Sequence, residues 1–275
     1  MRTGTLQVSG ADLHHEMRGS GPVLLLLPAG GGDAAVFDGI AGVLAERYTV
    51  LTLDPRGYSR SRLAPSGPVE QRVDVQSEDA YRLLTHILPP GEEAYVYGSS
   101  SGAIVALDLL ARHPERLRLV VADQPPCARL LPDAEEQLFF ERVYEAFRAG
   151  GLGAAAAYFL DGIGGTLKPM PDPAGLPPRT AEMIGRLNAN FPLFLEHELR
   201  QFTSYVPDEA ALAAVSERLV LAAGRDTRGH LPYRPAAELA DRLGLEVTEF
   251  PGGHSGYTDC PEEFGRRLVE VLGAR

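Results

Sequence analysis

Short apolar runs alternate with longer helical patterns along most of this chain, and this alternation restricts its fold more than any other feature. Strand-like runs occupy residues 23–27, 48–53, 95–97, 117–121, 219–222 and 246–250. Apolar residues at helical spacing lie between or after them, at 36–44, 80–87, 103–111, 236–243 and 264–272. Strands and helices that alternate in this way build a mostly parallel sheet with helices on both faces. We therefore predict an α/β fold, with residues 3–8 and 13–17 forming a hairpin at the sheet edge.

The pattern changes between Cys127 and Val206. Helical stretches rich in aromatic residues surround a connector rich in Pro and Gly at residues 168–178, and no strand is convincing there. We predict that residues 1–126 and 207–275 form one α/β core and that residues 127–206 form an all-helical cap. Its aromatic side chains are suited to an apolar pocket.

Charge and cysteine content narrow the classes of function. The 275 residues include 26 Lys and Arg against 37 Asp and Glu, a formal net charge of −11. Such a charge repels nucleic-acid phosphates and anionic lipid headgroups, so we expect neither nucleic acid nor membrane as a partner. The two cysteines have no metal-type spacing, and no apolar run has signal-peptide or membrane-span length. We expect a cytoplasmic protein, and the oligomeric state stays open, a homodimer included.

A serine flanked by glycines follows the strand predicted at 95–97 and precedes the apolar helix predicted at 103–111. The segment is Gly98-Ser99-Ser100-Ser101-Gly102, and only Ser100 has glycine two positions away on both sides. A nucleophile on a sharp strand-to-helix turn needs such glycines, because larger side chains would collide across the bend. The helix would also direct the N–H of Ser101 at a developing negative oxygen. The pattern predicts Ser100 as a nucleophile, although a flexible loop could have the same five residues.

A serine nucleophile needs a base, which is usually histidine. Of seven histidines, His254 lies in a glycine-rich loop between the last predicted strand and the last predicted helix. His230 follows the strand at 219–222 and is a weaker alternative. The other five fit surface or packing positions, so we predict His254 as the base.

The order Ser100, an acid and then His254, on alternating strands and helices with a helical insertion, resembles the α/β-hydrolase superfamily over essentially the whole chain. Residues 53–59, Leu-Asp-Pro-Arg-Gly-Tyr-Ser, are also similar to the D-x-R-G-x-G-x-S segment of that family. In the family this segment is structural.

The resemblance implies further site residues. Members commonly place the acid after the strand that follows the insertion, where Asp226 stands one position early. Asp123 is the alternative, because some members place the acid after the strand at 117–121. A second oxyanion donor is expected in the loop after the strand at 23–27, which here is Gly30 or alternatively Gly31. The family's usual histidine is missing from that loop.

These assignments imply a serine hydrolase that cleaves a small to medium hydrophobic ester, thioester or lactone through an acyl-enzyme intermediate. Ser100, Asp226 and His254 would form the triad, and the N–H groups of Gly30 and Ser101 the oxyanion hole. No metal or organic cofactor is implied.

Two other classes of function stay open. Residues 30–35 match G-x-G-x-x-A between a predicted strand and helix, and Asp54 follows at a strand end. This pattern is near the fingerprint of an NAD(P)-binding Rossmann oxidoreductase, although that fingerprint normally opens its domain. The third class is a ligand-binding or non-hydrolytic member of the α/β-hydrolase superfamily, because fold and motif do not guarantee turnover.

Overall fold

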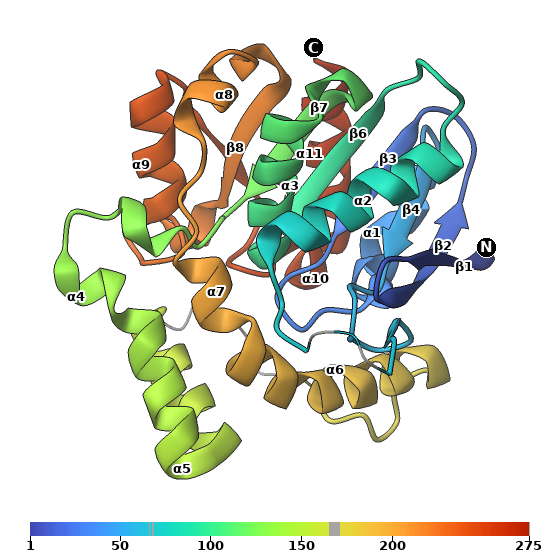
Figure 1. Ribbon diagram of the computed structural model, residues 1–275. Helices are drawn as coiled ribbons and strands as arrows, with labels where there is room; N and C mark the ends of the chain where they lie inside the picture. The colour runs from blue at the N-terminus through green and yellow to red at the C-terminus, as the bar shows by residue number, and fades with distance from the viewer. Residues whose placement is uncertain (66, 68, 165–170, 275) are drawn as a thin grey trace.

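The computed structural model describes residues 1–65, 67, 69–164 and 171–274, and within them a nine-stranded sheet forms the centre of the molecule (Figure 1). The strands follow the order β1-β2-β4-β3-β6-β7-β8-β9, and β5 pairs with β2. Their bounds are β1 (Arg2–Val8), β2 (Ala11–Arg18), β3 (Val23–Leu27), β4 (Thr49–Leu53), β5 (Arg62–Leu63), β6 (Ala94–Ser99), β7 (Leu117–Asp123), β8 (Leu219–Gly224) and β9 (Val247–Phe250). Strands β4, β3, β6, β7, β8 and β9 pair in parallel. The predicted α/β fold with a mostly parallel sheet is confirmed.

The predicted hairpin at the sheet edge is also present. Strands β1 and β2 pair antiparallel over their whole length, and β2 then pairs antiparallel with β4. The hairpin therefore extends a parallel sheet by two antiparallel strands.

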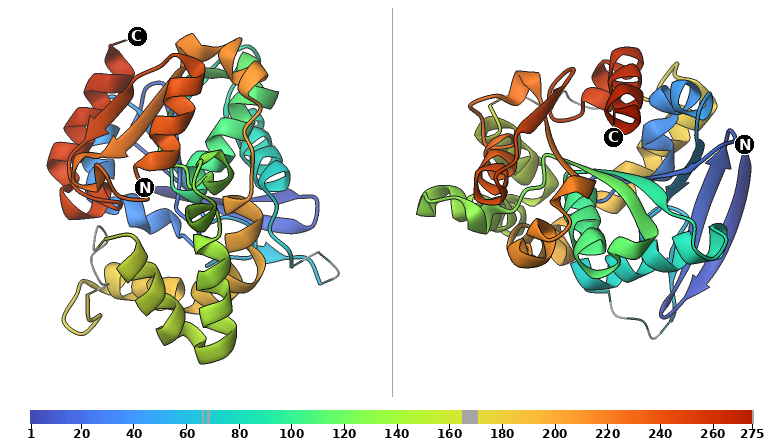
Figure 2. Two further views of the ribbon diagram at one scale, coloured as in Figure 1. Left: turned by 90° about the vertical axis from the view of Figure 1, so that its left-hand side faces the viewer. Right: turned by 90° about the horizontal axis from the view of Figure 1, so that it is seen from above.

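Helices cover both faces of the sheet (Figures 1 and 2). The side chains of β3 show how the chain supplies both layers, because Leu25 and Leu27 point into one hydrophobic cluster and Leu24 and Leu26 into the other. The first cluster includes side chains of α2 (Val73–Ile87), α3 (Ser101–Arg112), α8 (Glu209–Ala213) and α9 (Arg234–Leu243). The second includes those of α1 (Asp38–Ala45), α10 (Gly256–Asp259) and α11 (Pro261–Gly273). A strand buried on both faces needs this continuous aliphatic run.

The segment predicted as a cap contains helices and no strand among its described residues, and it lies along one side of the core (Figure 1). The helices are η3 (Ala128–Leu130), α4 (Ala134–Gln137), α5 (Phe139–Gly162), α6 (Pro178–His197) and α7 (Leu199–Thr203). Phe139, Phe140 and Leu195 belong to a hydrophobic cluster of the segment's own. Residues 165–170, which include the start of the predicted connector, lie outside the described residues. The boundaries at 127 and 206 stay a prediction.

Ion pairs connect α6 to the core. Arg179 Nη2 lies 2.6 Å from Glu16 Oε2 on β2, and Arg186 Nε lies 2.6 Å from Asp33 Oδ2 in the loop after β3. Both carboxylates are buried in the core. Burial alone would raise the pKa of Glu16, but close contacts with His14, Arg179 and Arg60 outweigh it and hold the pKa far below its usual range. These contacts fix α6 above the loop that contains Gly30, one of the two predicted oxyanion donors.

None of the helices in the described part of the chain combines the length and apolar character that a bilayer-spanning segment requires.

Candidate active site

Ser100 occupies the sharp turn between β6 and α3. Its backbone has φ 53° and ψ −118°, a left-handed conformation that is uncommon for a residue with a side chain. Its N–H donates to the carbonyl of Asp123 at the end of β7 (2.9 Å). Such a conformation costs roughly 1–3 kcal/mol and persists only where the surrounding structure enforces it. The turn therefore presents Ser100 in a fixed position at the carboxyl edge of the sheet.

The two flanking glycines make this turn sterically possible. A Cβ added at Gly98 would lie 2.2 Å from the carbonyl oxygen of Gly102, and one added at Gly102 would lie 2.3 Å from that of Leu27. These neighbours are backbone atoms that cannot move aside as a flexible side chain would. The spacing that singled out Ser100 in the sequence thus has a direct structural cause.

Replacing Gly102 by alanine is expected to destabilise the protein by about 3 kcal/mol, because the added methyl group overlaps the end of β3. The matched control is Gly185→Ala in α6, where the new Cβ has no atom within 4 Å apart from the adjoining backbone of its own helix. Alanine is the better helix former, so this control is expected to stabilise the chain by about 0.5–1 kcal/mol. Urea unfolding of both variants measures the difference. Equal stabilities would contradict the steric account.

The close approach of Gly102 to the end of β3 also brings together the two segments that contain the predicted oxyanion donors. Ser101 is the first residue of α3, where the N–H groups need no acceptor within the helix. Gly102 packs against the backbone of Leu27 and Pro28, two residues before Gly30. The segment after the nucleophile and the loop after β3 are therefore in direct contact, as an oxyanion hole requires.

One face of α6 covers this loop. Asn190 donates from Nδ2 to the carbonyl of Gly31 (2.8 Å) and accepts the N–H of Ser59 at Oδ1 (3.0 Å). A Cβ added at Gly30 would lie 2.2 Å from the Phe194 ring and 2.8 Å from Glu198 Oε1. Residues 190, 194 and 198 are four apart, so they lie on one side of the helix and its end.

Glu198 is a buried carboxyl group that the sequence analysis missed. It is 2% exposed, and no ion pair among the described residues includes it. Burial raises the pKa of Glu198 to about 7, although nearby hydrogen-bonding groups favour its ionised form, namely Tyr58, Ser101, Gln76 and the N–H of Gly31. Oε2 and the buried Tyr58 hydroxyl nevertheless lack a partner with regular hydrogen-bond geometry. The only sequence signal is the four-residue spacing from Asn190 and Phe194.

His254 lies in the loop between β9 and α10, as predicted. The side-chain amide of Gln124 approaches the carbonyl oxygens of Gly253 (3.5 Å) and His254 (3.4 Å), so the end of β7 contacts both this loop and Ser100. Burial lowers the pKa of His254 to about 4. The imidazole is therefore neutral near pH 7, which a general base must be. Its Nδ1 is buried and has no hydrogen-bond partner.

The two candidate acids have different surroundings. The Asp226 side chain is 63% exposed, and Oδ1 lies 3.7 Å from Arg225 Nε. Its N–H, however, donates to the carbonyl of Gly252 (3.1 Å), so its turn contacts the His254 loop. Asp123 is 1% exposed and accepts a hydrogen bond from the Tyr97 hydroxyl at Oδ2 (2.7 Å), while Oδ1 has no partner. Burial raises the pKa of Asp123 to about 7.

Among the described residues, no hydrogen bond joins His254 to Ser100, Asp226 or Asp123. The structure brings the segments of these residues together at one edge of the sheet without forming a hydrogen-bonded triad. Catalytic hydrogen bonds are often long in unliganded enzymes. The triad and the oxyanion donors stay predictions. His230, the weaker alternative, is exposed and lies against Gly164 of the cap.

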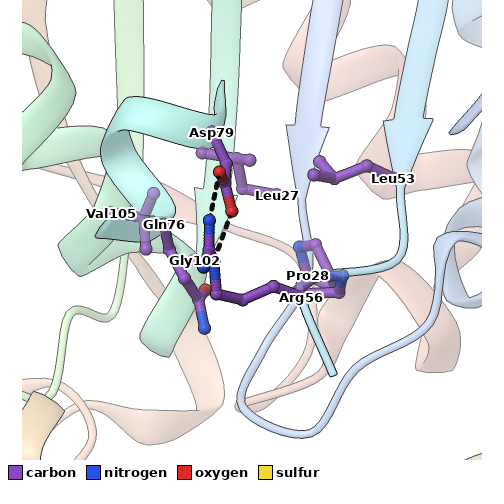
Figure 3. Close-up of a pocket in the computed structure, with 9 residues that line it drawn as sticks. Leu27, Pro28, Leu53, Arg56, Gln76, Asp79, Gly102 and Val105 are labelled. Carbon is purple, nitrogen blue, oxygen red and sulfur yellow. Dashed lines mark hydrogen bonds and ion pairs between the residues drawn. The ribbon is translucent and has the colours of Figure 1, made fainter. Parts of the chain in front are cut away.

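A small cavity lies beside the site (Figure 3). Its volume is about 20 Å³, which is close to the space of one water molecule and far below a ligand pocket. Gly102 and Gln76 line it together with Arg56 and Asp79, which form two hydrogen bonds of 2.7 and 2.6 Å. A larger hollow of about 580 Å³ lies at the starts of β3, β6 and β7, at the edge opposite Ser100.

The acid of the dinucleotide-binding pattern is already engaged. Asp54 is completely buried, accepts the N–H of Ala34 at Oδ1 (2.7 Å) and pairs with Arg60 through Oδ2 (2.7 Å). Asp33 within the same pattern pairs with Arg186 of α6. Neither carboxylate is available to a ribose. Among the described residues, no group of three or more His, Cys, Asp or Glu side chains is arranged to hold a metal ion.

Comparison with known proteins agrees with this geometry. The profile of the α/β hydrolase fold matches residues 22–180. The chain is 38% identical to the uncharacterised hydrolase YraK of Bacillus subtilis over 280 residues, which cover 99% of this chain and 96% of YraK. A pimeloyl-[acyl-carrier protein] methyl ester esterase of Aeromonas hydrophila is 39% identical over 113 residues, 41% of each chain. The solved structure of a hydrolase from Pseudomonas aeruginosa superimposes with a TM-score of 0.72 at 23% identity, covering 98% of both chains.

The chain therefore belongs to the α/β hydrolase fold family. Its relatives are hydrolases, and one is named as an esterase. This membership replaces the Rossmann alternative, because the Gly30–Gly32 loop here adjoins a serine turn and the acid at Asp54 is a structural ion-pair partner.

Proposed function

We propose that this protein is a serine hydrolase that cleaves small to medium hydrophobic esters, thioesters or lactones through an acyl-enzyme intermediate. The observation that carries the proposal is the Ser100 turn, in which a residue with positive φ stands between two glycines that admit no Cβ. This backbone geometry is typical of the nucleophile turn of α/β hydrolases.

In the proposed reaction, Ser100 Oγ bonds to the carbonyl carbon of the substrate while His254 accepts the hydroxyl proton. The carbonyl π electrons move onto oxygen, and the N–H groups of Gly30 and Ser101 stabilise the oxyanion. When the carbonyl re-forms, the bond to the alcohol or thiol breaks, and the leaving group takes the proton from His254. Water then repeats these steps and releases the acid. Asp226 orients the imidazole and stabilises its cation.

The cap supports the choice of an apolar substrate. Phe194 lies directly against Gly30, so one aromatic side chain of the cap adjoins the proposed oxyanion hole. Phe139, Phe140 and Phe159 pack against one another, and none of them is among the atoms nearest to Gly30. Phe194 is thus the aromatic residue that we assign to the substrate side.

A panel of p-nitrophenyl esters of graded chain length, with thioesters and lactones beside them, tests the proposal. We expect turnover that is highest for short to medium acyl chains, and covalent labelling of Ser100 by a fluorophosphonate probe, detected by peptide mass. Labelling without turnover of any panel member, together with tight binding of a ligand, would favour a non-hydrolytic member of the family. Absence of both labelling and turnover would contradict the proposal.

A further inference from the structure

Glu198 reaches the proposed oxyanion hole from the cap. It follows the last residue of α6, and its Oε1 lies 2.8 Å from the point where a Cβ of Gly30 would stand. The Ser101 side chain and the Gly31 N–H are also within its reach. The carboxyl group therefore borders the space between the two predicted oxyanion donors.

The groups that act most strongly on the Glu198 carboxyl carry no positive charge. They come from four segments of the core: Tyr58 from the loop after β4, Gln76 from α2, Ser101 from α3 and Gly31 from the loop after β3. The nearby guanidinium of Arg56 is neutralised by its two hydrogen bonds to Asp79. In the same stretch of the cap, His197 pairs with Glu70 (2.8 Å). Among the described residues, no ion pair balances a carboxylate at position 198.

Tyr58 is the neighbour of Glu198 whose hydroxyl is also buried. Its side chain is completely buried, and its hydroxyl approaches Glu198 closely enough to favour the ionised carboxyl. Both Tyr58 Oη and Glu198 Oε2 are buried polar atoms without a regular hydrogen bond. A buried polar atom without a partner lowers the stability of the fold. Its presence in a native structure therefore suggests a functional role or a ligand that satisfies it. The Tyr58 hydroxyl and the buried acid therefore belong to one local arrangement.

We propose that Glu198 is a third catalytic group of the oxyanion hole, which acts as an un-ionised carboxylic acid and opposes catalysis when it is ionised. This inference rests on the proposed function. The neutral acid can donate its O–H to the oxyanion beside the N–H groups of Gly30 and Ser101. A carboxylate would instead place a negative charge against the forming oxyanion, in a site where little water screens the repulsion. No proton needs to leave Glu198 during the reaction.

The wild-type pH profile is the first test. Because Glu198 has its pKa raised to about 7, the rate of fluorophosphonate labelling should fall about tenfold per pH unit above 7. On the acid side, the rate should fall only when His254 becomes protonated near its pKa of about 4. A wild-type rate that stays constant from pH 7 to pH 9 would overturn the inference.

Variants then assign the alkaline limb to Glu198. Glu198→Gln keeps a neutral donor of the same shape, so its labelling rate should lose the decline above pH 7. Tyr58→Phe removes a hydroxyl that favours the carboxylate, so the decline should move to higher pH. Glu196→Gln, two residues earlier in α6, is the matched control, because Glu196 pairs with Arg148 outside the site (2.9 Å). This variant should keep the wild-type pH profile. Circular dichroism of each variant checks folding.

The alternative outcomes are distinguishable. If Glu198→Gln keeps the wild-type decline and Asp123→Asn removes it, the titrating group is Asp123, whose pKa is also raised to about 7, and the inference on Glu198 is wrong. If the wild-type protein is neither labelled nor active at any pH, the proposed serine chemistry fails, and the inference fails with it.

Discussion

Replacing Ser100 by alanine is expected to lower ester hydrolysis at least about a thousandfold, because the reaction then has no nucleophile. The fold should survive, because alanine can adopt the backbone conformation of Ser100 at a similar cost. The hydrogen bond from the N–H of residue 100 to the carbonyl of Asp123 is also unchanged. The measurement is kcat/KM on the best ester of the panel, together with fluorophosphonate labelling. A variant that keeps more than about one thousandth of the wild-type value would show that the nucleophile lies elsewhere.

Ser99→Ala is the control for that experiment. Ser99 is the adjacent serine, but it is buried, and its hydroxyl lies near those of Tyr97 and Tyr257. Its removal should leave labelling and hydrolysis near the wild-type level. Thermal unfolding of both variants separates a loss of chemistry from a loss of structure.

If the proposed triad is right, replacing Asp226 by asparagine is expected to lower kcat about 10³–10⁴-fold, as the loss of the triad carboxylate does in serine proteases. Asparagine cannot stabilise the imidazolium and favours the wrong tautomer of His254. Asp226 must first turn from Arg225 toward His254, and its N–H contact with Gly252 already holds the two turns together. Stopped-flow or steady-state kinetics with a single ester measure the change.

Asp123→Asn is the comparison that decides between the two acids. Its carboxyl is held by the Tyr97 hydroxyl, and burial raises its pKa to about 7, so we expect a much smaller loss of kcat. A large loss in this variant alone would make Asp123 the acid. No large loss in either variant would indicate a dyad of Ser100 and His254.

Most of the fold could be predicted because its signals are periodic and strong. The aliphatic run of β3 and the apolar stripes of α2 and α3 leave few alternatives to a covered parallel sheet. The two-residue strand β5 (Arg62–Leu63) could not be found, because so short a pairing with β2 leaves no pattern. The ends of the predicted elements differ from the structure by a few residues, as fraying and capping would produce.

Site residues could be predicted only where a short local sequence pattern indicates their role. Gly98 and Gly102 mark Ser100 because the steric requirement acts over four residues of chain. Glu198 has no such mark, since an acidic residue at a helix end normally lies in solvent. Its burial depends on α6 lying over the loop after β3, which tertiary ion pairs such as Arg186 with Asp33 determine. The orientation of the Asp226 side chain likewise depends on neighbours that the sequence does not specify.

The positive φ of Ser100 also limits which nucleophiles this scaffold can accept. Threonine has a hydroxyl of similar reactivity, but its branched Cβ strongly disfavours that backbone conformation. Cysteine has no branch and could take the same place with a thiol. An engineer who wished to change the chemistry of this enzyme could therefore exchange oxygen for sulfur at position 100, whereas a single added methyl group would disrupt the turn.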